Sequence, residues 1–394
     1  MTNGVIYLDY AATSPVDPAV IEAMTACLGP DGAFANAASP HAAGAAAKAV
    51  IEVARARVGA LVGAAGDRLV FTAGATEANN LALKGMFPAG PRAGNEASAG
   101  HLVTSAIEHR SVLDTAAALE AAGVAVTRVG CDANGIVSPA RIASAITPGT
   151  RLVSVMLVNN EIGSLQDIEA IAAVCRDAGV PLHVDAAQGA GKVPLDIEGW
   201  GIDLCSLTAH KLNGPKGIGA LYVRPGLSLS PLIHGGEAAL GVRAGTLPTH
   251  QIVGFGKAFE IAAARNEAAG LARLRDRLWE GLAGIEDVRR QGDPARSAPH
   301  ILSVSFPGVE GESLRLALAD IAVSAGSACT SNEPEPSHVL RSLGLSDALA
   351  ESSLRFGVGR FTTGAEIDTA AERVGTEVSR LRAVARGAPD WCRA

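Results

Sequence analysis

Short apolar runs alternate with amphipathic stretches from residue 68 to residue 224, and this alternation constrains the fold more than any other feature. The apolar runs are rich in β-branched residues, whereas the stretches between them place apolar residues at helical spacing. Strands that alternate with helices form a mostly parallel sheet with helices on both faces. The sequence therefore predicts an α/β fold whose large domain holds a mostly parallel sheet of the seven-stranded type. The strand-like runs are 68–74, 101–109, 124–130, 151–160, 181–188, 203–210 and 219–225.

The pattern changes after the Gly-, Pro- and Arg-rich passage 291–299. Beyond it, short strand-like runs alternate with short helices, and a last helix opens with Thr363 three residues before Glu366, which is a capping box. We therefore expect a smaller C-terminal α+β domain. Long helices are expected at 41–62 and 248–284, the second broken or kinked near its glycines. The expected division is an N-terminal segment 1–15 that joins the small domain, a large domain 16–260 and a small domain 261–394.

Charge and cysteine spacing exclude several classes of protein. The 33 basic and 40 acidic residues give a formal charge of −7, which argues against a nucleic-acid partner because such binding needs a basic face. The six cysteines lie at least 30 residues apart, which excludes zinc-ribbon spacing and a dense disulfide framework, so we expect no metal site and a reduced setting. With no signal-like N-terminus and no apolar run of ~20 residues, we expect a soluble, cytoplasmic protein without a membrane partner.

Lys211 is the best candidate for an amine that binds a carbonyl cofactor. A Schiff-base enzyme needs such an amine at the end of a scaffold strand, and Lys211 follows the apolar run 203–209 and His210. It precedes the turn-rich sequence LNGPKG, so it lies where a strand leads to the ligand side of the sheet. The residues alone leave two interpretations open, a cofactor lysine or a solvated loop lysine.

Asp185 closes a strand of the buried type, in PLHVDAAQ. A buried carboxylate requires a cation or hydrogen-bond donors, and a protonated pyridine nitrogen is one such partner. A helix cap or a structural ion pair is the alternative. Gln188 lies three residues further on, where it could bond the hydroxyl of such a ring.

The sequence TAGATE at 72–77 could bind a phosphate, because its glycine permits close approach of the backbone and Thr76 opens a helix. A glycine cluster alone is a weak signal. The sequence GAGKV at 189–193 is not a P-loop, because it lacks the upstream glycine and the following serine or threonine of that motif.

Cys329 lies in VSAGSACTSNEPEP at 323–336, a segment of small and polar residues that ends in prolines. We expect this segment to be exposed. The cysteines at 27, 131, 175 and 205 fall instead in helical or strand-like runs, where cysteine behaves as a small apolar residue. Cys329 is thus either a nucleophile or an inert loop thiol, because the sequence does not show what would lower its pKa.

Taken together, these segments resemble the cysteine desulfurases of the pyridoxal-phosphate-dependent class V aminotransferase family, over nearly the whole chain. SAGSACTS resembles the first of the family's two groups, which has the longer cysteine-bearing loop and serves iron–sulfur assembly or nitrogen fixation. The Gly-His-His-Cys pattern of the other group is absent. The matching segments are YLDYAATSPVD (7–17), FTAGATEANNLALKG (71–85), EHRSVLD (108–114), VNNEIGSLQDI (158–168), HVDAAQGAGK (183–192), LTAHKLNGPKGIGALYVR (207–224), RAGT (243–246), SAGSACTS (324–331) and LRFGVGRFTT (354–363).

The resemblance implies a fold type I enzyme with pyridoxal 5'-phosphate bound to Lys211 as a Schiff base. It implies that Asp185 pairs with the pyridine nitrogen and that His109 stacks on the ring. It also implies a homodimer. The further implied contacts are Ala75, Thr76, Thr208 and His210 with the phosphate, Thr246 with the phosphate from the partner subunit, Asn160 and Gln188 with cofactor or substrate, and Arg355, helped by Asn36 and Asn160, with the substrate carboxylate.

The reaction that the resemblance implies converts L-cysteine to L-alanine. Lys211 moves the α-proton, and the Cys329 thiolate attacks the substrate sulfur, so that Cys329 carries a persulfide for transfer to an acceptor protein such as an iron–sulfur scaffold. Two segments depart from the family pattern, HGGEAALGVRAGT (234–246) and FANAAS (34–39). The rival interpretations are another pyridoxal-phosphate lyase or transaminase of the same fold, such as a selenocysteine lyase, and a non-catalytic scaffold.

Overall fold

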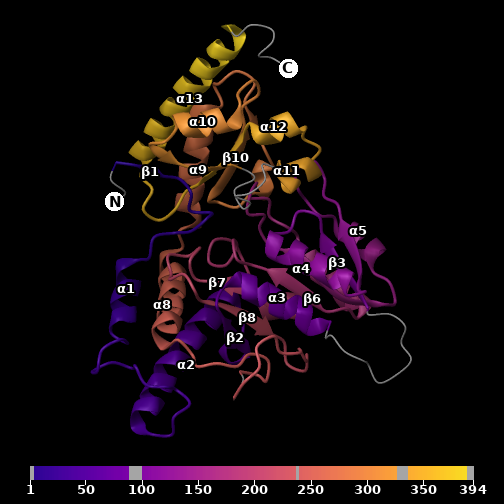
Figure 1. The fold of residues 1–394 in the computed structure, drawn as a ribbon, viewed down its shortest axis with the longest axis vertical. Helices are drawn as coiled ribbons and strands as arrows, with labels where there is room; N and C mark the ends of the chain where they lie inside the picture. The colour runs from indigo at the N-terminus through magenta and orange to yellow at the C-terminus, as the bar shows by residue number, and fades with distance from the viewer. Residues whose placement is uncertain (1–3, 88–99, 237–238, 326–335, 388–394) are drawn as a thin grey trace.

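The computed structural model describes residues 4–87, 100–236, 239–325 and 336–387. The chain forms two lobes, one above the other in Figure 1. The lower lobe holds the large sheet, and the upper lobe holds a small sheet with the long C-terminal helix along its edge. Cys329 lies outside the described residues.

The large sheet has seven strands in the order β2-β8-β7-β6-β5-β3-β4. Strand β8 is antiparallel to both of its neighbours, and the other neighbouring strands are parallel. This confirms the predicted α/β fold with a mostly parallel sheet. The strands are β2 (Leu69–Thr72), β3 (His101–Ser105), β4 (Ala125–Val129), β5 (Thr150–Met156), β6 (Leu182–Asp185), β7 (Leu204–Thr208) and β8 (Gly219–Val223).

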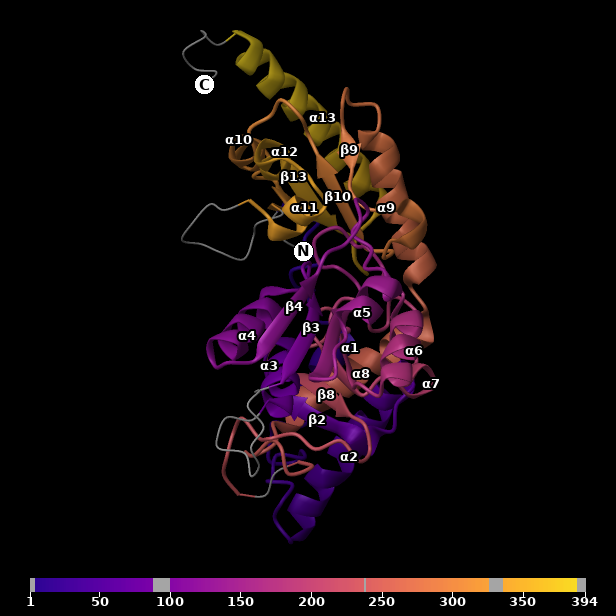
Figure 2. The same cartoon turned by 90° about the vertical axis from the view of Figure 1, so that its right-hand side faces the viewer.

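Helices cover both faces of this sheet, and Figure 2 shows α4 and α6 on opposite sides of it. Successive residues of one strand enter different cores: Val70 packs with the helices α3 and α4, whereas Phe71 packs with α2 and α8. Burial on both faces explains why the strands are continuous apolar runs. The helices are α1 (Pro18–Thr25), α2 (Ala42–Val62), α3 (Ala75–Met86), α4 (Arg110–Ala121), α5 (Pro139–Ala145), α6 (Ile168–Ala178), α7 (Ile197–Trp200) and α8 (Thr249–Arg265).

The upper lobe has its own core around a four-stranded antiparallel sheet of order β12-β13-β10-β9. The N-terminal strand β1 (Ile6–Tyr7) belongs to this lobe, because it pairs in parallel with β11 (Ile321–Ala322). The remaining strands are β9 (Arg289–Arg290), β10 (Ile301–Ser305), β12 (Ser324–Ala325) and β13 (Ser353–Gly357). The helices are α9 (Ala268–Leu282), α10 (Gly311–Ala317), α11 (His338–Ser342), α12 (Asp347–Glu351) and α13 (Gly364–Gly387).

The long helical pattern 248–284 breaks where α8 ends and α9 begins, and the break lies at Asn266 rather than at a glycine. Asn266 takes the left-handed conformation with φ 45°, which asparagine tolerates better than most residues and which ends a helix. At α13 the predicted capping box is present, because the Glu366 carboxylate accepts from the Thr363 N–H at 2.7 Å.

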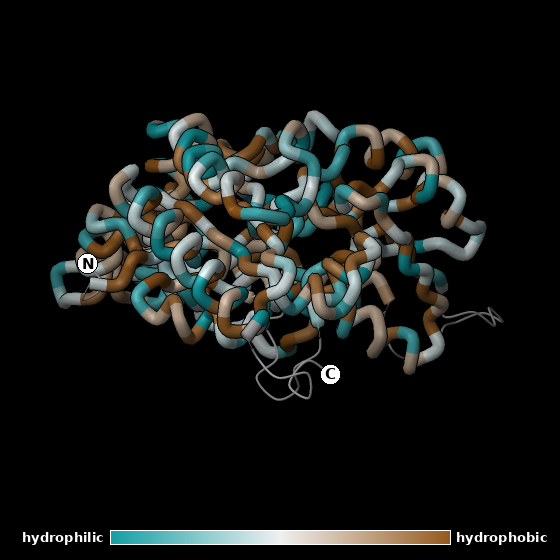
Figure 3. The backbone as a smooth tube through the Cα atoms, turned by 90° about the horizontal axis from the view of Figure 1, so that it is seen from above, coloured by the Kyte–Doolittle hydropathy of each residue, from teal (hydrophilic) through white to brown (hydrophobic). Residues whose placement is uncertain are grey.

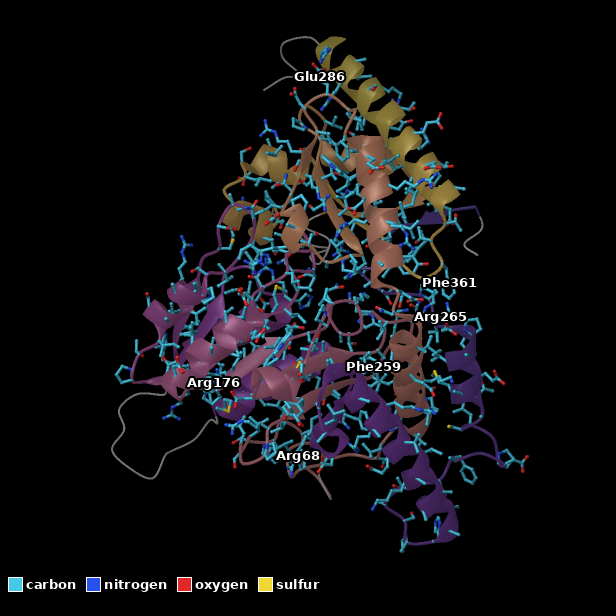
Figure 4. The ribbon with its side chains drawn as sticks, turned by 180° about the vertical axis from the view of Figure 1, so that it is seen from behind. Arg68, Arg176, Phe259, Arg265, Glu286 and Phe361 are labelled. Carbon is cyan, nitrogen blue, oxygen red and sulfur yellow. The ribbon has the colours of Figure 1, made fainter. Side chains whose placement is uncertain are left out.

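A buried arginine joins the two lobes near this break. Arg360 follows β13, and its guanidinium pairs with Asp17 at the start of α1 and with Glu267 between α8 and α9, each at 2.8 Å. Figure 4 labels Arg265 and Phe361, the neighbours of this cluster, at the junction of the lobes. A buried pair is costly to break, so these contacts hold the lobes in a defined relation.

No helix in the described part of the chain is long and apolar enough to cross a membrane. The backbone tube in Figure 3 changes between hydrophobic and hydrophilic colours every few residues.

Gly219 opens β8 at a point where three backbone segments meet, and Gly219→Ala should therefore destabilise the protein. A Cβ there would lie 2.5 Å from the Leu207 carbonyl oxygen and 2.8 Å from Cα of Gly74, neither of which is a flexible side chain. Overpacking of this kind costs about 1–3 kcal/mol. We expect a lower thermal unfolding midpoint for Gly219→Ala and an unchanged one for Gly284→Ala, which has open space around it. Equal midpoints for the two variants would contradict this account.

Candidate active site

A cavity of about 1010 Å³ lies at the carboxyl ends of the parallel strands, and residues of both lobes line it. Three adjacent strands end on it with Met156, Asp185 and Thr208. The upper lobe contributes Ser324 and Arg355. This is the place where open α/β sheets bind ligands.

Lys211 lies at this cavity, in the turn after β7. Its Nζ donates to the Ala12 carbonyl oxygen at 2.7 Å and also to that of Ala11. Both acceptors belong to the N-terminal segment, so that segment fixes the position of the amine. A primary amine held by carbonyl oxygens at the mouth of a cavity can form a Schiff base with a carbonyl ligand.

Asp185 is buried, and two donors hold its carboxylate. Oδ1 accepts from the Ala187 N–H at 2.9 Å, and Oδ2 accepts from Asn79 Nδ2 at 2.7 Å. The two donors fix the orientation of the carboxylate, and its remaining acceptor capacity suits the cationic edge of a ligand in the cavity. Asn79 was not singled out from the sequence, since nothing in its neighbourhood shows that α3 packs beside the end of β6.

His109 caps α4, and its Nδ1 accepts from the Ser111 N–H at 3.1 Å. Burial lowers the pKa of His109, and the positive charges of Lys211 and Arg355 lower it further, against an opposing effect of Asp185. The imidazole is therefore neutral at neutral pH and lines the cavity as a flat, uncharged ring.

The predicted phosphate-binding residues meet at the start of α3. Gly74 has φ 151°, a conformation that favours glycine, and it delivers Ala75 and Thr76 to the cavity at the helix N-terminus. Thr208 and His210 line the same cavity. Burial, followed by the charges of nearby lysines, lowers the pKa of His210 to about 4, so its ring is neutral and can donate a hydrogen bond without adding charge.

Arg355 is held from two sides. One terminal nitrogen donates to the Asn160 carbonyl oxygen and the other to Asp9 Oδ1, both at 2.9 Å. Among the described residues, Arg355 Nε and Asn160 Oδ1 are buried without hydrogen-bond partners, so each has capacity left for a ligand. Asp9 was missed in the sequence, although it belongs to the segment YLDYAATSPVD.

Gln188 is buried between the lobes. Its Nε2 donates to the Ala11 carbonyl oxygen at 2.8 Å, and its Oε1 lies 3.2 Å from Nε2 of His300. His300 comes just before β10 of the upper lobe and was not recognised in the sequence. Burial holds its pKa well below the usual range, so His300 is neutral and donates to Gln188.

Asn36 and Thr246 are not brought to the cavity in this chain. Both are exposed, and the Asn36 side chain caps a local turn by accepting from the Ala38 N–H. Thr246 was expected to contact the phosphate in the partner subunit's cavity. Its absence from the lining of the cavity in its own chain therefore does not test that prediction. Cys329 lies outside the described residues, between 325 and 336. Next to this range, the Ser324 hydroxyl donates to Asp9 at 2.8 Å and the Ser337 hydroxyl donates to Glu161.

Glu108 is a fully buried carboxyl beside this site. Its Oε1 accepts from the Ser105 hydroxyl at 2.5 Å and from the Met156 N–H at 2.9 Å, while Oε2 has no partner among the described residues. Burial, with a smaller contribution from Asp185, raises the pKa of Glu108 to about 8. The side chain is therefore a neutral acid at neutral pH.

Glu108→Gln should remove a pH-dependent loss of stability. The folded-state pKa lies above the ordinary value of 4.5, so the stability that the protonated group contributes is complete below pH 4.5 and is lost as pH rises to about 8. Each pH unit in this window costs the wild type about 1.4 kcal/mol, whereas glutamine does not titrate. Thermal unfolding midpoints from pH 5 to 8 should shift progressively in favour of Glu108→Gln. The exposed Glu169→Gln is the control, and parallel curves for wild type and Glu108→Gln would rule the explanation out.

The fold and the site define a class V aminotransferase: residues 6–369 match the family model described as "Aminotransferase class-V", and the chain belongs to this family. It is 51% identical over 382 residues to the cysteine desulfurase IscS of Shewanella woodyi, covering 96% of this chain and 93% of that protein. A solved "NifS-like protein" superposes with a TM-score of 0.87 at 32% identity, over 96% of this chain and 100% of the other. SspA, solved in complex with cysteine, gives 0.79 at 36% identity, over 91% and 100%.

Proposed function

We propose that this protein is a cysteine desulfurase, which takes sulfur from L-cysteine onto its own Cys329, releases L-alanine and supplies sulfur for iron–sulfur cluster assembly. The observation that carries the proposal is the joint presence, in one cavity, of the Lys211 amine, the held carboxylate of Asp185 and the buried guanidinium of Arg355. The relatives named IscS support it, with half of their residues identical over nearly the full length.

The residues of the cavity fit pyridoxal 5'-phosphate. Asn160 Oδ1 and Arg355 Nε are buried and unpartnered among the described residues, and the donors at the start of α3 suit a phosphate. Lys211 would hold the group covalently, Asp185 its ring nitrogen, and Thr76, Thr208 and His210 its phosphate. When bound, pyridoxal phosphate supplies an electron sink that makes the Cα–H of an amino acid acidic.

Residues of this chain would bind the substrate, move its proton and accept its sulfur. Arg355 binds the substrate carboxylate, with Asn160 beside it. The Lys211 amine moves the proton at the substrate Cα. The Cys329 thiolate forms a bond to the substrate sulfur as the carbon–sulfur bond breaks, so one thiol and one cysteine give one persulfide and one alanine. We further propose a cytoplasmic homodimer that passes this sulfur to an acceptor protein.

The test is the stoichiometry of products from L-cysteine labelled with ³⁵S. Alanine should form in equal amount to the sulfur released by a thiol reductant, and without reductant the label should stay on the protein. Pyruvate with ammonia would indicate a lyase of another type, and a keto acid a transaminase. A protein that shows no Schiff-base absorption with pyridoxal phosphate would be a scaffold, and each of these three results would reject the proposal.

Arg355→Lys should weaken substrate binding while it leaves the charge in place. The three donors of a lysine ammonium lie on one nitrogen, so lysine lacks the planar fork with which Arg355 reaches Asp9, Asn160 and a substrate carboxylate from separate nitrogens. A lost bond between charged groups costs about 1.5–3 kcal/mol, so kcat/KM should fall roughly 10- to 100-fold, mostly through KM. Arg341→Lys, which disturbs an exposed pair with Asp347, should change kcat/KM less than about twofold. A fall in kcat alone would place Arg355 outside substrate binding.

A further inference from the structure

Asn79 connects two groups that line the cavity, Asp185 and His109. It lies on α3 and is fully buried, and its Nδ2 is 2.7 Å from Asp185 Oδ2 and 2.8 Å from Ser111 Oγ. Ser111 Oγ is in turn 2.8 Å from Nδ1 of His109. A continuous hydrogen-bonded chain thus runs from the carboxylate to the imidazole through one amide and one hydroxyl.

The donor and the acceptor of each hydrogen bond in this series can be assigned from the Asp185 carboxylate. The carboxylate of Asp185 can only accept, so the atom that faces it is the amide nitrogen of Asn79. The second proton of that nitrogen goes to Ser111 Oγ, whose own proton is then free for His109 Nδ1. The backbone N–H of Ser111 also donates to Nδ1, at 3.1 Å.

The consequence concerns the tautomer of His109. Because Nδ1 accepts from a hydroxyl and from a backbone N–H, the single proton of the neutral ring is on Nε2. In this form Nε2 donates a hydrogen bond and cannot accept a proton. A charged ring would place an N–H at Nδ1 against the Ser111 N–H, so the same contacts oppose protonation.

We propose that Asn79, acting through Ser111, is a positioning residue that orients the Asp185 carboxylate and fixes His109 as a neutral Nε2–H donor. The inference rests on the proposed function for its kinetic meaning: His109 donates to the ligand, and the base that removes the α-proton is Lys211. Burial and the positive charges of Lys211 and Arg355 also favour a neutral ring, whereas the carboxylates of Asp185 and Asp114 oppose this effect.

The first test needs no turnover. In the ¹⁵N-histidine-labelled holoenzyme, His109 should show an unprotonated Nδ1 and a protonated Nε2 across the range in which histidine ordinarily titrates, around pH 6.5. The resonance is assigned by its loss in His109→Gln. A protonated Nδ1 at neutral pH would overturn the proposal, whether or not the protein desulfurates cysteine. A correct tautomer without alanine formation would instead reject the proposed function alone.

The second test is a double-mutant cycle. Asn79→Leu and Ser111→Ala should each lower kcat roughly tenfold with little change in KM, and the double variant should fall no further than the worse single, because both break one chain. Ser111→Thr keeps the hydroxyl and should retain activity within about threefold. Thr104→Val, which deletes a buried bond to Ser154 elsewhere in β3, controls for general damage. The proposal would be overturned if the losses of kcat in the two single variants multiplied in the double variant. It would also be overturned if Thr104→Val lowered kcat as much as they do.

Discussion

Lys211→Ala is expected to abolish alanine formation, with a fall of at least roughly 1,000-fold in kcat. The variant loses the amine proposed to bind the cofactor and to move the α-proton. Lys216 lines the same cavity but follows Gly214 and Pro215 in a separate turn, so we expect it not to take over either role. The visible absorption of the Schiff base should disappear in the same variant. Steady-state alanine assays and absorption spectra of the purified protein measure both.

Lys211→Arg separates chemistry from structure. Arginine can keep hydrogen bonds to the carbonyl oxygens of Ala11 and Ala12, yet it cannot form the covalent bond. It should fold like the wild type and remain inactive. Lys48→Ala, an exposed change on α2, should have full activity. Substantial alanine formation by Lys211→Ala would mean that the amine is not the catalytic base.

Cys329→Ala is expected to stop sulfur release from L-cysteine in the presence of reductant. The four cysteines in the described ranges are poor substitutes, because burial raises the pKa of each thiol: that of Cys175 to about 12 and that of Cys205 well above its usual value. Since only the thiolate is a nucleophile, these groups are unreactive at neutral pH.

The matched control is Cys131→Ala, a half-buried thiol whose pKa burial also raises. It should release sulfur at the wild-type rate. In Cys329→Ala, ³⁵S from cysteine should no longer remain on the protein after gel filtration. Undiminished release by this variant would show that another group accepts the sulfur.

The sequence was sufficient to predict the sheet and the residues at its carboxyl edge. Burial on both faces produces continuous apolar runs, and the polar residue that ends each run, such as Asp185, then lies at the ligand side. The resemblance added roles for His109 and Arg355, and the structure brings both to the cavity.

The partners of these residues could not be predicted, because each comes from a distant part of the chain. Asp9 is 346 positions from Arg355, and Asn79 is 106 positions from Asp185. Spacing within a segment gives no information about such contacts. Similarly, the long helical pattern does break as expected, but the residue that ends α8 is the left-handed Asn266, which the apolar pattern does not mark, rather than a glycine.

The N-terminal segment has a consequence for the order in which the molecule can be completed. Ile6 pairs with Ile321, and Ala11 and Ala12 accept hydrogen bonds from Lys211, so the segment that holds this amine gains its full set of contacts only after residue 321 has been synthesised. At 5–20 residues per second, a ribosome needs roughly 15–60 s between these two strand partners. The large sheet can form during that interval because its strands all end by Val223, whereas Cys329 and Arg355, on which the proposed reaction depends, have not yet been synthesised.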